Sequence, residues 1–272
     1  MKPVIFAATA SALLFAQSAR SGAPAAAPLK PTGSWVINFD DAQCVAEREY
    51  GSSGKPLTLV LKQPPIGEVM QVGVVSNGGP KEPEQYRGTI AFDTRIVKAS
   101  VLTYRPHGSV KGVRLVNMPL KHFAAAAGSK ILTFDSGSGV HSTFELEALP
   151  SVLQLLNQCA ADLRTVWKVD SSEADRQLQG VRGKGLGKLI SPNDYPRDAV
   201  LAEQSGTVTM ALLIDETGKV ADCSVIATSG VAILDSQSCA VVKIRAKFVP
   251  ITDSTGKPIK TSVIQRITWK LG

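Results

Sequence analysis

The residues of this sequence that are best suited to chemistry are its four cysteines, Cys44, Cys159, Cys223 and Cys239. Thiols in proteins either pair as disulfides or bind soft metal ions, and metal binding usually shows closely spaced ligands. No C-x-x-C pair occurs, and the three histidines all precede Ser142, far along the chain from the last two cysteines. The sequence therefore predicts disulfides and no metal site, although four cysteines allow three pairings.

A second candidate for chemistry is the segment 132–137 (LTFDSG), which resembles the catalytic loop of an aspartic peptidase. Such enzymes need two carboxylates that share one proton, so a chain with one such loop would act as a dimer. A second Asp-Ser/Thr-Gly is absent, and the loop lies between two runs that are typical of hairpin strands, 131–134 and 142–146. We favour a turn and keep a dimeric peptidase that uses Asp135 as the alternative.

Cofactor and nucleic-acid motifs are also lacking in the sequence. The run 183–187 (GKGLG) superficially resembles a phosphate-binding loop, but G-K-[ST] is absent and no strand precedes it. The formal net charge of +7 is scattered along the chain, without the aromatic-rich basic stretch that favours single-strand binding. We expect no cofactor, no nucleic-acid partner and a mildly basic protein near anionic lipid or polysaccharide.

The N-terminus has the composition of a secretory signal. Lys2 precedes the thirteen-residue apolar stretch 4–16, and small residues follow as far as Ala27. A membrane-spanning helix needs roughly 17 to 25 residues, so we interpret residues 1–27 as a cleaved signal peptide and expect a periplasmic protein. If the signal is not cleaved, the protein is membrane-anchored instead.

Short strands must position most of residues 31–170. The runs 57–61, 69–75 and 89–92 are aliphatic or β-branched and are bounded by clusters of glycine, proline and asparagine. From residue 150 to 167 the apolar spacing changes to three and four, which predicts an amphipathic helix with Cys159 on its apolar stripe. A bond from Cys159 to Cys44 would join this helix to the first strands and contribute about 4 to 5 kcal/mol in the chain-entropy model.

A polar and then glycine-rich stretch, 171–188, is the predicted flexible linker between two domains. After it we expect a short helix over 194–202, a hairpin of strands 207–214 and 219–228, a helix from an N-cap at Asp235 to residue 247, and a last strand. On that last strand one face is predicted to be buried (Val263, Ile267, Trp269 and Leu271) and the other exposed (Ser262, Ile264, Arg266, Thr268 and Lys270).

Residues 190–271 carry motifs that resemble the TonB C-terminal domain family. They are Tyr195-Pro196 with Ala199, Gly206, Ile214-Asp215, Gly218 to Val220, Ser229-Gly230, Leu234-Asp235, Phe248 to Pro250, and Asp253 with Gly256 to Pro258. The resemblance implies an α+β domain over 189–272, of helix-strand-strand-helix-strand order, that binds partners and is not an enzyme.

The family resemblance also implies a mode of binding. A short extended peptide of an outer-membrane receptor or another envelope protein would add to an exposed edge strand. By this resemblance the last strand, with Ile264, Arg266 and Thr268, and the region of Tyr195 and Pro196 are the candidate contact residues. The alternative is that Tyr195 only packs the first helix and that Arg266 is only solvated.

The chain also departs from the family's transducers, which have an N-terminal membrane helix and a long proline-rich spacer. A strand-rich domain, 31–170, occupies that position instead. We therefore expect a periplasmic adaptor that supports TonB-dependent transport, with an anchored energy transducer as the alternative. A structural role at the envelope, in which residues 31–170 bind peptidoglycan or another polymer, also stays open, as does a homodimer.

The last two cysteines lie on the second strand and the helix of this C-terminal region. A bond between Cys223 and Cys239 would close a short loop across a small core and contribute about 3 kcal/mol in the same model. The alternative is two buried free thiols, and export favours the bond.

Overall fold

The computed structural model describes residues 27–271 except 40, 53, 107, 168, 170–188 and 254. Two predictions, the signal peptide up to its last residue and the linker 171–188, lie outside the described residues. We call the described residues up to Val169 the N-terminal part and residues 189–271 the C-terminal part. In both parts helices and sheets are mixed, and the N-terminal part is rich in strands, as the sequence predicts.

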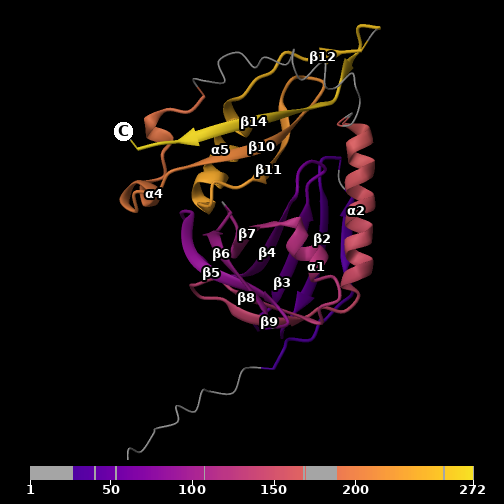
Figure 1. Cartoon of the computed structure of the whole chain (residues 1–272), viewed down its shortest axis with the longest axis vertical. Helices are drawn as coiled ribbons and strands as arrows, with labels where there is room; N and C mark the ends of the chain where they lie inside the picture. The colour runs from indigo at the N-terminus through magenta and orange to yellow at the C-terminus, as the bar shows by residue number, and fades with distance from the viewer. Residues whose placement is uncertain are drawn as a thin grey trace, which may run out of the picture.

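The N-terminal part is a nine-stranded antiparallel sheet in the order β1-β2-β3-β4-β7-β6-β5-β8-β9 (Figure 1). Its strands are β1 (Val36–Phe39), β2 (Cys44–Tyr50), β3 (Leu57–Gln63), β4 (Val69–Asn77), β5 (Glu84–Phe92), β6 (Arg95–Tyr104), β7 (Lys111–Pro119), β8 (Ile131–Asp135) and β9 (His141–Glu145).

The two ends of this sheet are joined by the short segment Leu29 to Pro31. The backbone N–H of Leu29 donates to Thr143 of β9 at 2.7 Å, and Pro31 forms a bridge with Tyr50 of β2. The Tyr50 hydroxyl also donates to the carbonyl of Glu145 at 2.8 Å. The curled sheet encloses a packed core in which several aromatic rings are buried, namely Tyr50, Phe92, Phe123, Phe134 and Phe144.

Helix α2 (Leu149–Val166) packs against β1, β2 and β3, close to the predicted bounds. A disulfide joins Cys159 of α2 to Cys44 of β2, which is the pairing that the apolar stripe favours. Trp167 closes the helix; its side chain is buried and its indole N–H donates to the carbonyl of Asp41 at 2.7 Å. The shorter α1 (Leu120–Ala125) contributes Phe123 to the core.

The C-terminal part is a three-stranded sheet in the order β11-β10-β14, with helix α5 against it. Its elements are the 3₁₀ helix η2 (Pro192–Asp194), α4 (Arg197–Leu201), β10 (Gly206–Ile214), β11 (Val220–Ala227), α5 (Ala232–Arg245), β12 (Ile251–Thr252), β13 (Pro258–Ile259) and β14 (Thr261–Trp269). The predicted helix over 194–202 is thus two pieces with Tyr195 and Pro196 between them. A disulfide joins Cys223 of β11 to Cys239 of α5, as expected.

The predicted N-cap role of Asp235 is wrong. Helix α5 begins four residues earlier, with Val231 as its N-cap, and Asp235 lies inside the first turn and is 1% exposed. Its carboxylate accepts hydrogen bonds from the backbone N–H and the hydroxyl of Ser229, at 2.8 and 2.7 Å, and from the hydroxyl of Thr228. Because those groups precede the helix and need acceptors, the acid secures the loop in front of the helix.

Two residues of the predicted last strand also differ from prediction. Leu271 lies beyond the strand and is 38% exposed, whereas Ser262 is buried. Ser262 is the register partner of Leu213 on β10, and Leu213 packs with the core of the N-terminal part. The N-terminal part therefore covers this end of the sheet face that the alternation predicts to be solvent-exposed.

The contact between the two parts was not predicted. Leu102 and Tyr104 of β6 and Leu115 of β7 share an apolar cluster with residues of the C-terminal part, among them the first turn of α5, Ala232 to Leu234. Leu102 is thereby buried, and Tyr104 and Leu115 are partly buried. Among the described residues, no helix is long and apolar enough to span a membrane.

Candidate functional site

The most prominent feature of the C-terminal part is the edge strand β14. It pairs with β10 along its whole length, from Thr261 opposite Ile214 to Trp269 opposite Gly206. Among the described residues no strand pairs with its second edge, so its outward N–H and C=O groups are not used in a sheet. In Figure 1, β14 lies on the side of the C-terminal part that faces away from the N-terminal part.

The opposite edge strand, β11, lies against the N-terminal part. Gly67 has a positive φ of 92°, and a Cβ atom added there would be 2.3 Å from the Cγ2 atom of Ile226. The ammonium of Lys62 on β3 is 3.5 Å from the carboxylate of Asp222, which is buried on β11. Such close packing leaves β14 as the more open of the two edges.

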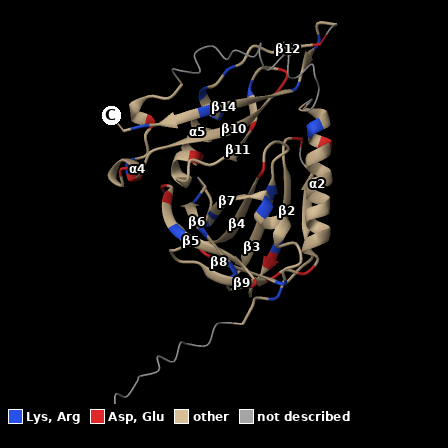
Figure 2. Ribbon diagram, in the orientation of Figure 1, with Lys and Arg blue, Asp and Glu red and all other residues tan. Residues whose placement is uncertain are grey.

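Three predicted contact residues lie together on the exposed face of β14. Ile264 is 56% exposed, and Arg266 and Thr268 are exposed with it. The hydroxyls of Thr268 and of Thr207 on β10 are 3.0 Å apart. Arg266 and, just after the strand, Lys270 supply positive charge, and neither β10 nor β14 contains an acidic residue. Figure 2 shows a basic position, in blue, on the β14 ribbon.

Tyr195 and Pro196, the other predicted contact residues, lie near the last residues of β14. The Tyr195 ring packs edge-to-face on Trp269, with centroids 5.1 Å apart, and its hydroxyl donates to the carbonyl of Gln204 at 2.6 Å. Pro196 is the N-cap of α4. Tyr195 therefore has a structural role in packing on Trp269.

A cavity of about 520 Å³ opens beside Tyr195. Its lining combines the loop before α4 with the end of β14 and consists of Ile190, Ser191, Pro192, Tyr195, Val200, Thr268, Trp269, Lys270 and Leu271. The alternation along the last strand predicts only a core position for Trp269 and Leu271. Their place beside the cavity depends on the loop 190–196, whose position the strand pattern does not predict.

An ion pair holds that loop against the end of α5. The guanidinium of Arg245 donates to both carboxylate oxygens of Asp194, at 2.7 and 2.8 Å. The backbone N–H and the hydroxyl of Ser191 donate to the same carboxylate. These hydrogen bonds, first of all those from Arg245, hold the pKa of Asp194 well below its usual range. The wall of the cavity is thus tied to α5.

Asp135, the residue of the peptidase alternative, ends β8 in the predicted hairpin with β9. One carboxylate oxygen accepts the backbone N–H of Gly137 at 2.8 Å, and the other is 3.3 Å from Nδ1 of the exposed His141. Gly137 has a positive φ of 72°, which suits glycine in a turn. The observed geometry is that of a hairpin turn.

The fold and the site define a class: a small α+β domain with an open sheet edge next to a partly apolar cavity. Residues 191–271 match the family model described as Gram-negative bacterial TonB protein C-terminal. Residues 191–271 are therefore assigned to the TonB C-terminal domain family, and that family is a non-enzymatic, transport-associated domain of the bacterial envelope. The comparisons with curated proteins and with solved structures found no match for the chain.

Proposed function

We propose that this protein is a periplasmic adaptor that binds an extended segment of an outer-membrane receptor, or of another envelope protein, in support of TonB-dependent transport. The segment adds as a fourth strand beside β14. The observation that carries the proposal is the edge of β14, which no described strand pairs along nine residues, while β11 packs against the N-terminal part.

The chemistry of β14 defines the partner segment further. Main-chain hydrogen bonds supply affinity in strand addition, and cross-strand side-chain pairs of about 0.2 to 1 kcal/mol each supply selectivity. Ile264 and Thr268 offer contact to apolar and β-branched side chains, and Arg266 and Lys270 offer positive charge. The segment is therefore acidic and β-prone, and one apolar side chain enters the cavity beside Tyr195 and Trp269.

The domain organisation in this proposal is an exported chain with a domain over 31–170 and a TonB-like domain over 189–272. Two disulfides, Cys44 to Cys159 and Cys223 to Cys239, support an oxidising compartment. A second copy of the chain could also pair with the edge of β14, and it would then compete with the partner segment. Homodimerisation through this edge is the second outcome that the experiment below separates.

The test uses two seven-residue peptides that alternate valine with glutamate or with lysine. The oxidised protein should bind the acidic peptide, and hydrogen exchange should slow in β14 and not in β11. The backbone amides of alternate peptide residues are then N-methylated. When the methylated amides are those that face β14, binding should weaken by about fivefold per methyl group, because each lost hydrogen bond costs about 1 kcal/mol. The complementary methylation pattern should leave binding unchanged.

A matched pair of variants checks the site. Arg266→Glu should reverse the charge preference between the two peptides, whereas Lys121→Glu, on the exposed side of α1, should not. Slower exchange in β11, or equal effects of the two methylation patterns, would contradict strand addition to β14. If, without peptide, protection of β14 from hydrogen exchange increases with protein concentration, the edge is occupied by a second copy of the chain, which would indicate the homodimer.

A further inference from the structure

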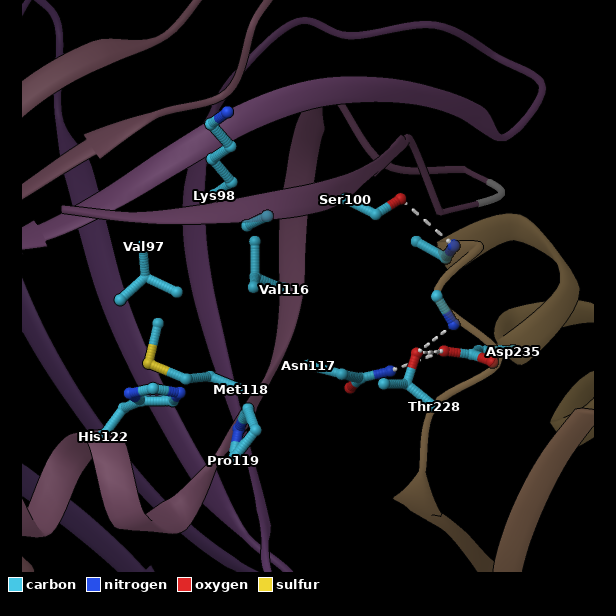
Figure 3. Close-up of a pocket in the computed structure, with 13 residues that line it drawn as sticks. Val97, Lys98, Ser100, Val116, Asn117, Met118, Pro119, His122, Thr228 and Asp235 are labelled. Carbon is cyan, nitrogen blue, oxygen red and sulfur yellow. Dashed lines mark hydrogen bonds between the residues drawn. The ribbon is translucent and has the colours of Figure 1, made fainter. Parts of the chain in front are cut away.

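A cavity of about 330 Å³ lies between the N-terminal and C-terminal parts. Figure 3 shows its two walls: β6, β7 and the start of α1 on one side, and the loop and first turn of α5 on the other. The lining residues are Val97, Lys98, Ala99, Ser100, Val116, Asn117, Met118, Pro119, His122, Thr228, Gly230, Ala232 and Asp235. No element of the proposed β14 site takes part in it.

Hydrogen bonds between the two parts hold these walls together. The hydroxyl of Ser100 accepts the backbone N–H of Ala232 at 3.2 Å, and the side-chain carbonyl of Gln85 accepts that of Ile233 at 3.1 Å. Helix α5 has no side-chain cap from its own N-cap residue, Val231. The N-terminal part therefore supplies two of the acceptors that the first turn of α5 needs, and these bonds hold the two walls of the cavity together.

One end of the cavity is formed by the buried carboxylate of Asp235. All its hydrogen-bond donors are neutral groups of Thr228, Ser229 and Asn117, and among the described residues no lysine, arginine or histidine pairs with it. The N-terminus of α5 offsets part of its charge, but a negative charge remains in a poorly solvated place. Burial accordingly raises the pKa of this carboxyl.

The bond from Asn117 to Asp235 is the weakest of the set. Its donor and acceptor are 3.5 Å apart, at the limit for a hydrogen bond. A stronger donor in the cavity, in particular a charged one, can take this position, since charge-assisted hydrogen bonds are shorter and about twice as strong. The side-chain carbonyl of Asn117 would still accept the amide N–H of Gln71 at 3.1 Å.

The other end of the cavity is apolar. Val97 and Met118 point toward each other across it, with Pro119 and the ring of His122 beside them, and the side chain of Lys98 points away (Figure 3). A ligand that fits these two ends has a short apolar body and a single positively charged head.

We propose that this cavity is a binding site for a small organic ammonium compound, whose head pairs with Asp235 and whose apolar body lies along Val97, Met118 and Pro119. Because both parts of the chain form the walls, the bound ligand holds them in the docked arrangement. The site is independent of strand addition to β14.

The test titrates the oxidised full chain with n-hexylammonium chloride, 1-hexanol and sodium hexanoate, followed by ligand-observed NMR. The ammonium ion should bind with a Kd roughly tenfold below that of the alcohol, which corresponds to about 1.4 kcal/mol, and hexanoate should not bind. Asp235→Asn removes the charge with little change of shape, so the ammonium ion and the alcohol should then bind alike.

A second variant covers the case in which Asp235→Asn does not fold. Val97→Phe fills the cavity without touching Asp235 and should abolish binding, whereas Ile96→Phe, at a position that is 69% exposed on the same strand, should not. The proposal is overturned if the alcohol binds as tightly as the ammonium ion, if Val97→Phe binds as the native chain does, or if none of the three compounds binds.

Discussion

At the scale of single residues, two carboxylates of the C-terminal part, Asp194 and Asp235, lie in different electrostatic surroundings. Asp194 pairs with a guanidinium at the surface end of α5, and Asp235 is buried among neutral donors. The pKa of Asp194 is lowered, first of all by the hydrogen bonds from Arg245, whereas burial raises that of Asp235. The sequence marks both as acidic, but only their surroundings distinguish the two.

The Asp194–Arg245 pair leads to a pH-dependent prediction. Because the folded-state pKa of Asp194 lies below its ordinary value, the unfolded chain binds the proton more readily. The stabilisation is therefore complete above about pH 5 and is lost as the pH falls through the acidic range.

The variant Arg245→Gln should accordingly melt below the native protein at pH 7, and the difference should shrink toward pH 3, measured by circular dichroism. Lys247→Gln, two residues further along the chain, is the control, since no ion pair of Lys247 is found within the described residues. A difference that is constant from pH 7 to pH 3 would refute the assignment.

At the scale of elements, periodicity predicts the strands and helices well where one face is apolar. Helix α2, the β8–β9 hairpin and the β10–β11 hairpin follow from three- and four-residue spacing, alternation and turn residues. The start of α5 does not follow, because Asp235 resembles an N-cap in sequence while the true cap position is Val231. Tertiary burial of the 228–235 loop overrides the local signal.

The two disulfides should contribute unequally to stability. The bond between Cys44 and Cys159 spans 115 residues, and that between Cys223 and Cys239 spans 16. Chain entropy predicts losses of about 4 to 5 and about 3 kcal/mol in the free energy of unfolding when each pair is changed to serine. Urea unfolding of the two double variants measures this, and a larger loss for the shorter loop would contradict the entropic account.

At the scale of the whole molecule, the sequence predicts two domains and a linker but not that the domains dock. The outer faces of β6 and β7 carry Leu102, Tyr104 and Leu115. Apolar side chains on both faces of a strand indicate that a second layer packs on it, so these three residues are a sequence signal for the docking. Alternation along a strand predicts a single buried face and therefore does not reveal this second layer.

The contact between the two parts should make them unfold together in one cooperative thermal transition. Leu102 is 3% exposed in the cluster between the two parts, so Leu102→Glu buries a charge there or separates the parts. We expect the single thermal transition of the native chain to split into two in calorimetry. Ile96→Glu, on an exposed site of the same strand, should keep one transition, and one unshifted transition for both variants would show that the parts unfold independently of this contact.

The sequence by itself determined the local and compositional properties of this protein: the strands with a clear apolar run or alternation, α2, the disulfide-forming cysteines and the motifs of the TonB C-terminal domain family. Those properties depend on neighbours within a few turns or on residue types, which a linear pattern preserves. Only the tertiary structure decided the closure of the sheet through Leu29 to Pro31, the docking that covers β11 and leaves the edge of β14 open, and the cavity beside Asp235. Each of these features depends on contact between surfaces that are far apart in the sequence. Whether such surfaces fit together is set by their shape and burial, which the hydrophobic periodicity of the sequence does not encode.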